Sequence, residues 1–202
     1  MVLKDAQTRG AKSLVITSAE GRAGRSTAVL NLALSLVASG WQVIVIDGDL
    51  RRPQLHAALN LPNLRGLTSV LRGQCLVRDA VMESGVAGLS VLGSGPQDPA
   101  PGAIVGSPRF EPLLRELETM ADLVLLDSPP ILDYADALEL AAVAHRVLFI
   151  AAEERSIKAE VAEAARRLSR THGVMGALML NKANHWQAAG EGNSQVEFRM
   201  AG

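Results

Sequence analysis

The sequence predicts an α/β fold, a doubly wound and mostly parallel sheet with helices on both faces. Short aliphatic runs alternate with helical segments along the chain. Those runs are continuously apolar, as expected of parallel strands that helices cover on both sides. The chain has 202 residues, of which 48% are hydrophobic and 20% charged, which suffices for one domain with a sizeable core.

The aliphatic runs predict the strands, and longer segments between them predict helices. A helix over 27–39 is apolar nearly all round and ends at Gly40, a residue suited to a helix C-terminus. A second helix is expected near 110–120, and a third over 157–170 carries one apolar stripe. The expected strands are Leu14–Thr17, Val43–Ile46, Leu89–Leu92, Leu123–Leu126, Val147–Ile150 and Val174–Leu180.

Two stretches interrupt this alternation. Residues 93–108 are rich in Gly and Pro and predict a loop. Residues 184–202 have no periodicity and predict a mobile tail. We therefore expect a single domain over 1–183, followed by the tail.

Composition excludes several classes of function. Twenty Lys and Arg against 21 Asp and Glu leave a net charge of −1, which predicts no general affinity for nucleic acid. The single cysteine, Cys75, excludes a disulfide framework and a cysteine-cluster metal site, and the four histidines have no metal-ligand spacing. No stretch supplies the ~20 apolar residues of a membrane-spanning helix, and the first residues do not form a secretory signal. These observations predict a cytoplasmic protein.

The segment LVITSAEGRAGRSTAVLNLA, residues 14–33, is the most informative part of the chain. A strand ends at Thr17, a glycine-containing loop follows, and a helix begins near Ser26. Loop amides and a helix N-terminus form an anion cradle, and Ser26 stands where a phosphate-loop hydroxyl binds Mg²⁺. The pattern G-x-x-x-x-G-K-[ST] nevertheless fails twice, because Ala19 replaces its first glycine and Arg25 its lysine.

The loop alone leaves three interpretations open. It is a phosphate loop, a strand-to-helix turn without a ligand, or a dinucleotide-binding turn. The third interpretation rests on Ala19, Gly21 and Gly24, which have the G-x-G-x-x-G spacing. Asp47, at the end of the next strand, would then bind the ribose.

Acidic residues further along the chain favour the phosphate loop. VIVIDGDLRRP places Asp47 and Asp49 after one strand, and LVLLDSPP places Asp127 after another. Hydrated Mg²⁺ takes one or two carboxylates together with phosphate oxygens. A dinucleotide site explains Asp47 but gives no role to Ser26, Asp49 or Asp127. The sequence therefore favours a site for a nucleoside triphosphate and Mg²⁺.

TSAEGRAGRST–NLA, VIVIDGDLRRP and LVLLDSPPILDYADA resemble the Walker A, Walker A′ and Walker B motifs of the bacterial tyrosine kinases of capsule and exopolysaccharide biosynthesis. GLTSVLRG, LSVLGSG and MLNK also resemble landmarks of this family, so the likeness covers nearly all of 12–183. The wider group includes partitioning and septum-positioning ATPases. The resemblance implies a P-loop NTPase fold with ATP and Mg²⁺ as cofactors.

Site roles follow from the resemblance by position. Ser26, Asp49 and Asp127 would hold the metal. Asp47 would position or activate the attacking group, and Arg25 stands at the family's catalytic lysine. Asn181 resembles the residue that reads the adenine edge, although a turn-capping asparagine is an equal alternative. The triphosphate would lie on Ala19, Glu20, Gly21, Arg22, Ala23, Gly24, Arg25, Ser26 and Thr27.

The implied reaction is transfer of the ATP γ-phosphoryl group to tyrosine. The implied partner is an inner-membrane chain-length or co-polymerase protein, which would bring the chain to that membrane as a peripheral protein, and a homo-oligomer is also expected. The N-terminus lacks the family's E-x-x-R-x-x-R oligomerisation motif, which argues against a ring like those of the family. The family's tyrosine-rich tail is also absent, because residues 183–202 contain no tyrosine and the only one in the chain is Tyr134.

Two alternatives stay open. With Arg25 in place of the lysine, the chain is a catalytically weak or inactive nucleotide-sensing subunit of the same system. Otherwise it is a partitioning-type ATPase, although Glu20 stands where those proteins carry an extra lysine.

Overall fold

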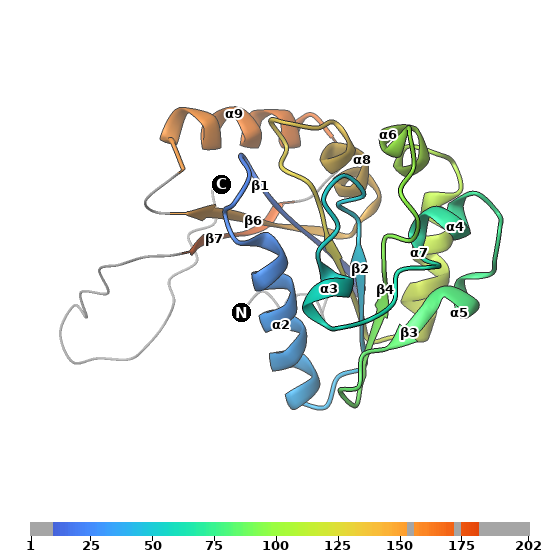
Figure 1. Cartoon of the computed structure of the whole chain (residues 1–202). Coiled ribbons are helices and arrows are strands. Elements are labelled where there is room, and N and C mark those ends of the chain that lie inside the picture. The colour runs from blue at the N-terminus through green and yellow to red at the C-terminus, as the bar shows by residue number, and fades with distance from the viewer. Residues whose placement is uncertain (1–9, 153–155, 172–174, 182–202) are drawn as a thin grey trace, which may run out of the picture.

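The computed structural model describes residues 10–152, 156–171 and 175–181 (Figure 1). Seven strands form one sheet in the order β3-β4-β2-β5-β1-β6-β7. β3 pairs antiparallel with β4, and all other neighbours are parallel. The strands are β1 (Ser13–Ser18), β2 (Val43–Asp47), β3 (Val81–Glu83), β4 (Leu89–Leu92), β5 (Leu123–Asp127), β6 (Arg146–Ala152) and β7 (Met175–Asn181).

The helices lie on both faces of this sheet. Strand side chains point alternately to its two sides, so β1, β2, β4, β5 and β6 each contribute to two cores. On β1, Leu14 and Ile16 pack into the core that also holds Val29 and Ala33 of the first long helix, whereas Val15 faces the other core. The helices are α2 (Arg25–Ala38), α3 (Leu55–Ala58), α4 (Leu67–Leu71), α5 (Val77–Ala80), α6 (Pro101–Val105), α7 (Phe110–Met120), α8 (Asp136–Val143) and α9 (Lys158–Ser169). The predicted doubly wound, mostly parallel fold is confirmed.

The connections reverse direction next to β1. The chain passes through α2 to β2 on one side of β1, and through α8 from β5 to β6 on the other. In open α/β sheets, ligands bind beyond the carboxyl ends of the strands at such a switch point. Asp127 at the end of β5 is in register with Ile16 of β1 and Asp47 of β2. The two strand-end acids therefore meet in the middle of the sheet.

The sequence prediction was wrong about one segment and missed others. Residues 93–108, predicted as a loop, contain the helix α6, which begins with proline at a position where its missing N–H costs nothing. α8, the antiparallel strand β3 and the short helices α3, α4 and α5 were not predicted. The predicted tail over 184–202 lies outside the described residues, as does Val174, the first residue of the last predicted strand.

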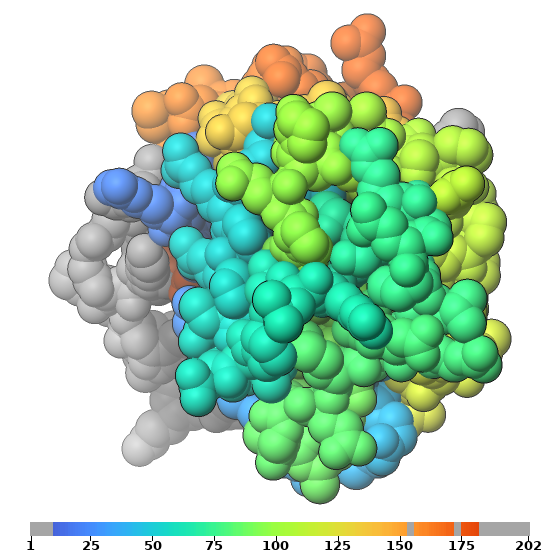
Figure 2. Space-filling view, turned by 45° about the vertical axis from the view of Figure 1, so that its right-hand side comes forward, coloured from blue at the N-terminus to red at the C-terminus, as the bar shows by residue number. Residues whose placement is uncertain are grey.

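Residues 50–105, coloured cyan to lime green, form much of the surface in Figure 2. They carry α3, α4, α5 and α6 and connect β2 to the helix that precedes β5. Within the described part of the chain, no helix has the length and apolar character needed to cross a membrane.

Candidate functional site

A cavity of about 340 Å³ opens at the carboxyl ends of the central strands. Its walls come from the loop between β1 and α2, the first turn of α2, the loop after β2 and the loop after β5. The lining residues are Gly21, Arg22, Gly24, Arg25, Ser26, Thr27, Asp49, Arg52, Gln54, Pro130, Asp133 and Tyr134.

The loop between β1 and α2 turns sharply through two residues with positive φ. Gly24 has φ 91° and Arg22 has φ 65°, a left-handed conformation that non-glycine residues rarely adopt. Gly24 is the cap residue of α2, and its carbonyl accepts from the amide of Ala28 at 2.9 Å. The first amides of a helix have no intrahelical acceptor. The N-terminus of α2 thus offers donors and a positive dipole end to an anion in this cavity.

Arg25 extends across the base of the loop. Its Nε donates to the carbonyl of Ser128 at 2.8 Å. Its Nη1 donates to Ser18 Oγ at 2.7 Å and to the carbonyl of Glu20 at 3.1 Å. Its Nη2 lies 3.6 Å from Asp49 Oδ2, and only 10% of the side chain is exposed. Protein acceptors therefore hold two of the three guanidinium nitrogens before any phosphate binds.

Ser26 and two acids lie beside this guanidinium. Ser26 Oγ donates to Asp127 Oδ2 in a very short hydrogen bond. Asp127 is almost fully buried, and its Oδ1 has no hydrogen-bond partner among the described residues. Asp49 is also buried, and its Oδ1 accepts from the amide of Arg52 at 3.1 Å. Ser26 and Asp49 thus line the cavity, whereas Asp127 contacts Ser26 but is not part of the lining.

Asp47 lies beneath these groups. Its Oδ2 accepts from the amides of Gln54 and Leu55 at 3.1 and 3.0 Å, which fixes the start of α3. Its Oδ1 has no hydrogen-bond partner among the described residues, and the side chain is fully buried. Asp47 does not line the cavity.

Burial and mutual repulsion disfavour the charged forms of these acids. Burial, with the negative charge of Asp127 as the next cause, raises the pKa of Asp47 to about 7. Burial raises the pKa of Asp127 to about 6, although the hydrogen bond from Ser26 and the charge of Arg25 oppose the rise. A cation bound beside these carboxylates would stabilise their charged forms and so lower both pKa values.

The chemistry of this site fits hydrated Mg²⁺. Two buried carboxylate oxygens lack partners, and the donor groups present are oxygens, which Mg²⁺ prefers. In the described ranges, no group of three or more His, Cys, Asp or Glu side chains could hold a metal ion. An ion bound here would take further ligands from a hydroxyl, water and phosphate, as Mg²⁺ bound with a nucleotide does.

The chain is similar to tyrosine-protein kinase YwqD of Bacillus subtilis. The two are 38% identical over 175 residues, which cover 86% of this chain and 74% of YwqD. The chain belongs to the bacterial tyrosine kinase family. No family model matches it.

Solved structures agree with this assignment. The kinase domain of the Escherichia coli tyrosine kinase Etk superposes with a TM-score of 0.85 and 25% identity, covering 96% of this chain and 78% of that domain. The septum site-determining protein MinD of Pyrococcus horikoshii, complexed with Mg-ADP, superposes with a TM-score of 0.72 and 23% identity. This superposition covers 84% of this chain and 69% of MinD, and at this level of identity it shows only that the two proteins share a fold.

The other predicted site residues are distributed around the Walker A loop of this family member. Within the loop, Ala19 and Ala23 are buried, and Asn181 Nδ2 donates to the carbonyl of Ala23 at 2.9 Å. Glu20 turns away from the cavity, since its Oε1 accepts from Ser156 Oγ at 2.6 Å. Gly21 and Thr27 line the cavity.

Sequence reasoning missed part of the opposite wall. Gln54, Pro130 and Asp133 line the cavity although no motif position singled them out. Pro130 and Asp133 stand within the Walker B string LVLLDSPPILDYADA, so proximity to Asp127 was the available signal. Gln54 has no comparable signal in the sequence.

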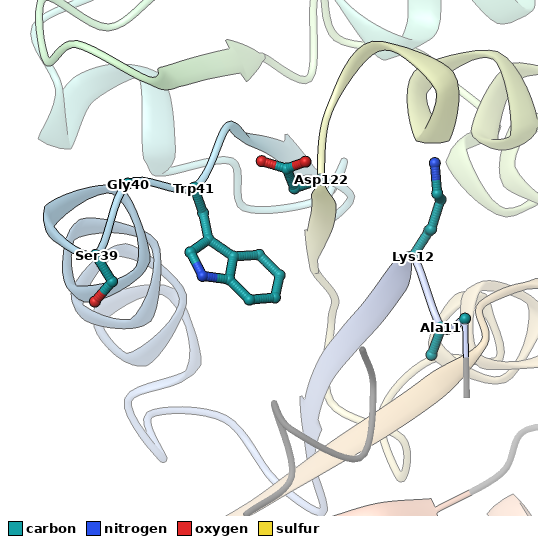
Figure 3. A pocket seen from close by; sticks show the side chains of 7 residues that line it. Ala11, Lys12, Ser39, Gly40, Trp41 and Asp122 are labelled. Atoms are coloured by element: carbon teal, nitrogen blue, oxygen red, sulfur yellow. The ribbon is translucent and has the colours of Figure 1, made fainter. Parts of the chain in front are cut away.

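A second cavity lies at the opposite edge of the sheet (Figure 3). It has a volume of about 380 Å³ and lies where β1, β2 and β5 begin. Lys12 Nζ donates there to the carbonyl of Glu118 at 3.0 Å, and Asp122 accepts from the amide of Gln42 at 2.8 Å. Gly10, Ala11, Ser39, Gly40 and Trp41 complete its lining, which includes none of the predicted site residues.

Proposed function

We propose that the chain binds Mg·ATP in the carboxyl-end cavity and transfers the γ-phosphoryl group to tyrosine, as the kinase module of a capsule or exopolysaccharide assembly system. One observation carries the proposal, namely the meeting of Ser26, Asp49 and Asp127 beside the Walker A loop. The similarity to YwqD supports the tyrosine kinase activity. The Mg-ADP complex of MinD supports a nucleotide with Mg²⁺.

Each group has a distinct role in this proposal. The loop over 19–27 and the N-terminus of α2 bind the phosphates, and Asn181 lies near the nucleotide base. Ser26, Asp49 and Asp127 hold hydrated Mg²⁺. When bound, the metal neutralises charge on the phosphate oxygens. Phosphoryl transfer demands mainly positioning and charge neutralisation from a protein, so these groups supply most of the effect.

Asp47 orients the attacking hydroxyl or accepts its proton. Without a bound cation, burial raises the pKa of Asp47 to about 7, and a cation beside Asp127 and Asp49 would lower it. Its side chain is fully buried, so it acts on a substrate hydroxyl only after the loop that follows β2 shifts.

The contacts of Arg25 favour a second candidate function, a nucleotide-sensing subunit with weak or no catalysis. Ser18, Glu20 and Ser128 hold the guanidinium in place. A side chain fixed in this way follows a departing phosphoryl group less readily than the flexible ammonium of lysine. ATP binding would then switch association with the partner.

The proposed partner is an inner-membrane chain-length or co-polymerase protein, and the chain would lie at that membrane through it. A homo-oligomer is part of the same proposal. A partitioning-type ATPase has less support, because Glu20 stands where those proteins carry lysine and its carboxylate bonds to Ser156 within the chain.

Labelled ATP tests the proposal. The purified chain is incubated with Mg²⁺, γ-labelled ATP and the membrane protein encoded beside it, and phosphotyrosine is mapped by mass spectrometry. Label on tyrosine supports the kinase. Nucleotide binding without label or hydrolysis supports the sensor, and hydrolysis without protein label supports a partitioning-type ATPase.

A further inference from the structure

Arg51, which follows Asp49 in the chain, contacts the segment that follows Asp127. Its Nε and Nη2 lie 2.8 and 3.2 Å from the two carboxylate oxygens of Asp136, which gives a bidentate pair. Its Cζ lies 4.3 Å from the ring centroid of Tyr134, so the guanidinium also stacks on an aromatic face. Asp136 is buried, whereas a third of the Arg51 side chain is exposed.

Arg51 and its two partners lie close in the chain to the two proposed metal ligands, Asp49 and Asp127. Arg51 follows Asp49 by two residues, in the loop after β2. Tyr134 and Asp136 lie between Asp127 and the body of α8. The loop after β2 has a second tie, because the amide of Gly48 donates to the carbonyl of Asp127 at 2.9 Å. Asp49 thus lies between two contacts that reach the β5–α8 segment.

The helix α6 packs directly against this pair. A Cβ atom at Gly102 would lie 2.7 Å from Asp136 Oδ1 and 3.6 Å from Arg51 Nη2. A side chain at position 102 would therefore have to displace the Asp136 carboxylate. Three segments that are distant in sequence meet at one ion pair.

We propose that Arg51 is a positioning residue for metal binding and that Asp136 and Tyr134 fix its orientation. This inference rests on the proposed function, since it concerns the distance between Asp49 and Asp127 when Mg²⁺ and a nucleotide bind. When Arg51 is fixed in this way, the loop that follows β2 keeps Asp49 beside Asp127 before the metal binds. Without the pair, binding must also order the loop that follows β2, which weakens metal binding.

The contacts of Arg51 with Asp136 and with the ring of Tyr134 require a guanidinium group at position 51 and an aromatic ring at position 134. A lysine at position 51 keeps the charge but loses the bidentate contact and the stacking. Leucine at position 134 removes the aromatic face, whereas phenylalanine keeps it. The variants Arg51→Lys, Asp136→Asn, Tyr134→Leu and Tyr134→Phe therefore form a graded series.

The test measures Mg²⁺-dependent binding of a fluorescent ADP analogue to the full chain. Arg51→Lys and Asp136→Asn should each raise the Mg²⁺ concentration at the midpoint about tenfold, as loss of an outer contact at a metal site does. Affinity for the metal-free analogue should stay within about twofold, because the phosphate loop is unchanged. Since both changes break one contact, the double variant should resemble each single one. Tyr134→Phe should shift the midpoint less than Tyr134→Leu.

Arg72 supplies a matched control. Its Nε and Nη2 form a bidentate pair with Asp98 at 3.0 Å, and neither residue lines the cavity. Arg72→Lys should leave the Mg²⁺ midpoint as in the wild type. Amide exchange over residues 48–55 of the nucleotide-free chain should accelerate in Arg51→Lys but not in Arg72→Lys.

The outcomes distinguish the two proposals. If the wild type binds the analogue with Mg²⁺ but Arg51→Lys and Asp136→Asn titrate like it, the positioning role is wrong and the proposed function stands. Equal losses with and without Mg²⁺ also overturn the positioning role, because they indicate general damage. If the wild type binds no analogue under either condition, the proposed function fails and the inference fails with it.

Discussion

At the residue scale, Asp47 and Asp127 make the site sensitive to pH when its ligands are absent. The pKa of Asp47 rises from 3.8 to about 7 in the folded chain, chiefly through burial. The folded chain thus binds a proton that the unfolded chain releases between these values, so the free energy of unfolding is highest at low pH within this window and falls as pH rises. The pKa of Asp127, about 6, contributes in the same direction.

Asp47→Asn should remove most of this dependence, because asparagine imitates the protonated carboxyl. We expect the free energy of unfolding of the wild type to fall by about 2–3 kcal/mol relative to the variant between about pH 5 and pH 8, measured by urea denaturation without nucleotide. The carboxyl of Asp98, whose pKa is lowered by hydrogen bonds from the amide of Ala100 and from Arg72, provides the control. Asp98→Asn should keep the wild-type slope, and a wild type that gains stability over this range would contradict the argument.

Arg25→Lys tests whether the fixed guanidinium limits turnover. The lysine keeps the charge, loses the hydrogen bond to Ser128 and can follow the γ-phosphoryl group. Because an interaction that is equal in the ground and transition states does not accelerate a reaction, affinity should change little. The rate of phosphoryl transfer with the membrane partner should rise about 10²- to 10³-fold, the effect of one well-placed electrostatic contact.

Three results are informative for Arg25→Lys. Such a rate gain at similar affinity identifies the wild type as a weakened kinase. Nucleotide binding without transfer in both forms supports the sensor. A wild type as fast as the variant would show that the arginine is fully competent.

At the element scale, the backbone just after β2 lies very close to the end of β5. A Cβ atom at Gly48 would lie 2.6 Å from the carbonyl oxygen of Asp127 and 3.0 Å from Leu140 Cδ1. Gly48→Ala should therefore push the loop that carries Asp49 away from β5. We expect a loss of about 1–3 kcal/mol in the free energy of unfolding, as overpacking typically costs, together with weaker Mg·ADP binding.

Gly176→Ala is the matched control for this substitution. Its new Cβ would meet atoms no closer than 3.5 Å, an ordinary contact. Its stability, measured by the same denaturation, should stay within about 0.5 kcal/mol of the wild type. A Gly48→Ala protein with unchanged stability and unchanged Mg·ADP affinity would show that the loop accommodates the methyl group.

The sequence predicted the elements that have a strong local signal. The continuous aliphatic runs at 43–46 and 123–126 correspond to β2 and β5, because a strand buried on both faces has little choice of residues. α8 was missed because its DALELAAV sequence is short and apolar, so it merges with the strand that follows. α6 was missed because Pro and Gly at its first two positions favour a loop.

The candidate site, too, could be predicted from the sequence only in part. Convergence of Asp47 and Asp127 could be predicted, since carboxyl ends of parallel strands meet at one edge of a sheet. The contact of Arg25 with Ser128 and that of Arg51 with Asp136 could not. They join residues 103 and 85 positions apart, and no local pattern encodes such pairings.

At the scale of the whole molecule, the distribution of tyrosine limits self-phosphorylation. Tyr134 is the only tyrosine among the 202 residues, and its ring lies beneath the Arg51 guanidinium. We expect the purified chain alone, incubated with Mg·ATP, to carry little phosphotyrosine. Mass spectrometry tests this directly, and abundant phosphate on Tyr134 would contradict it.

We propose above that Asp127 holds a metal that arrives with the nucleotide. Calorimetric titration of ADP into the wild type and Asp127→Asn, with and without Mg²⁺, tests it most directly. We predict that the substitution weakens binding about 10- to 100-fold when Mg²⁺ is present and by no more than about twofold when it is absent. Equal losses under the two conditions would show that Asp127 acts on the nucleotide or on the fold, and would contradict the metal site.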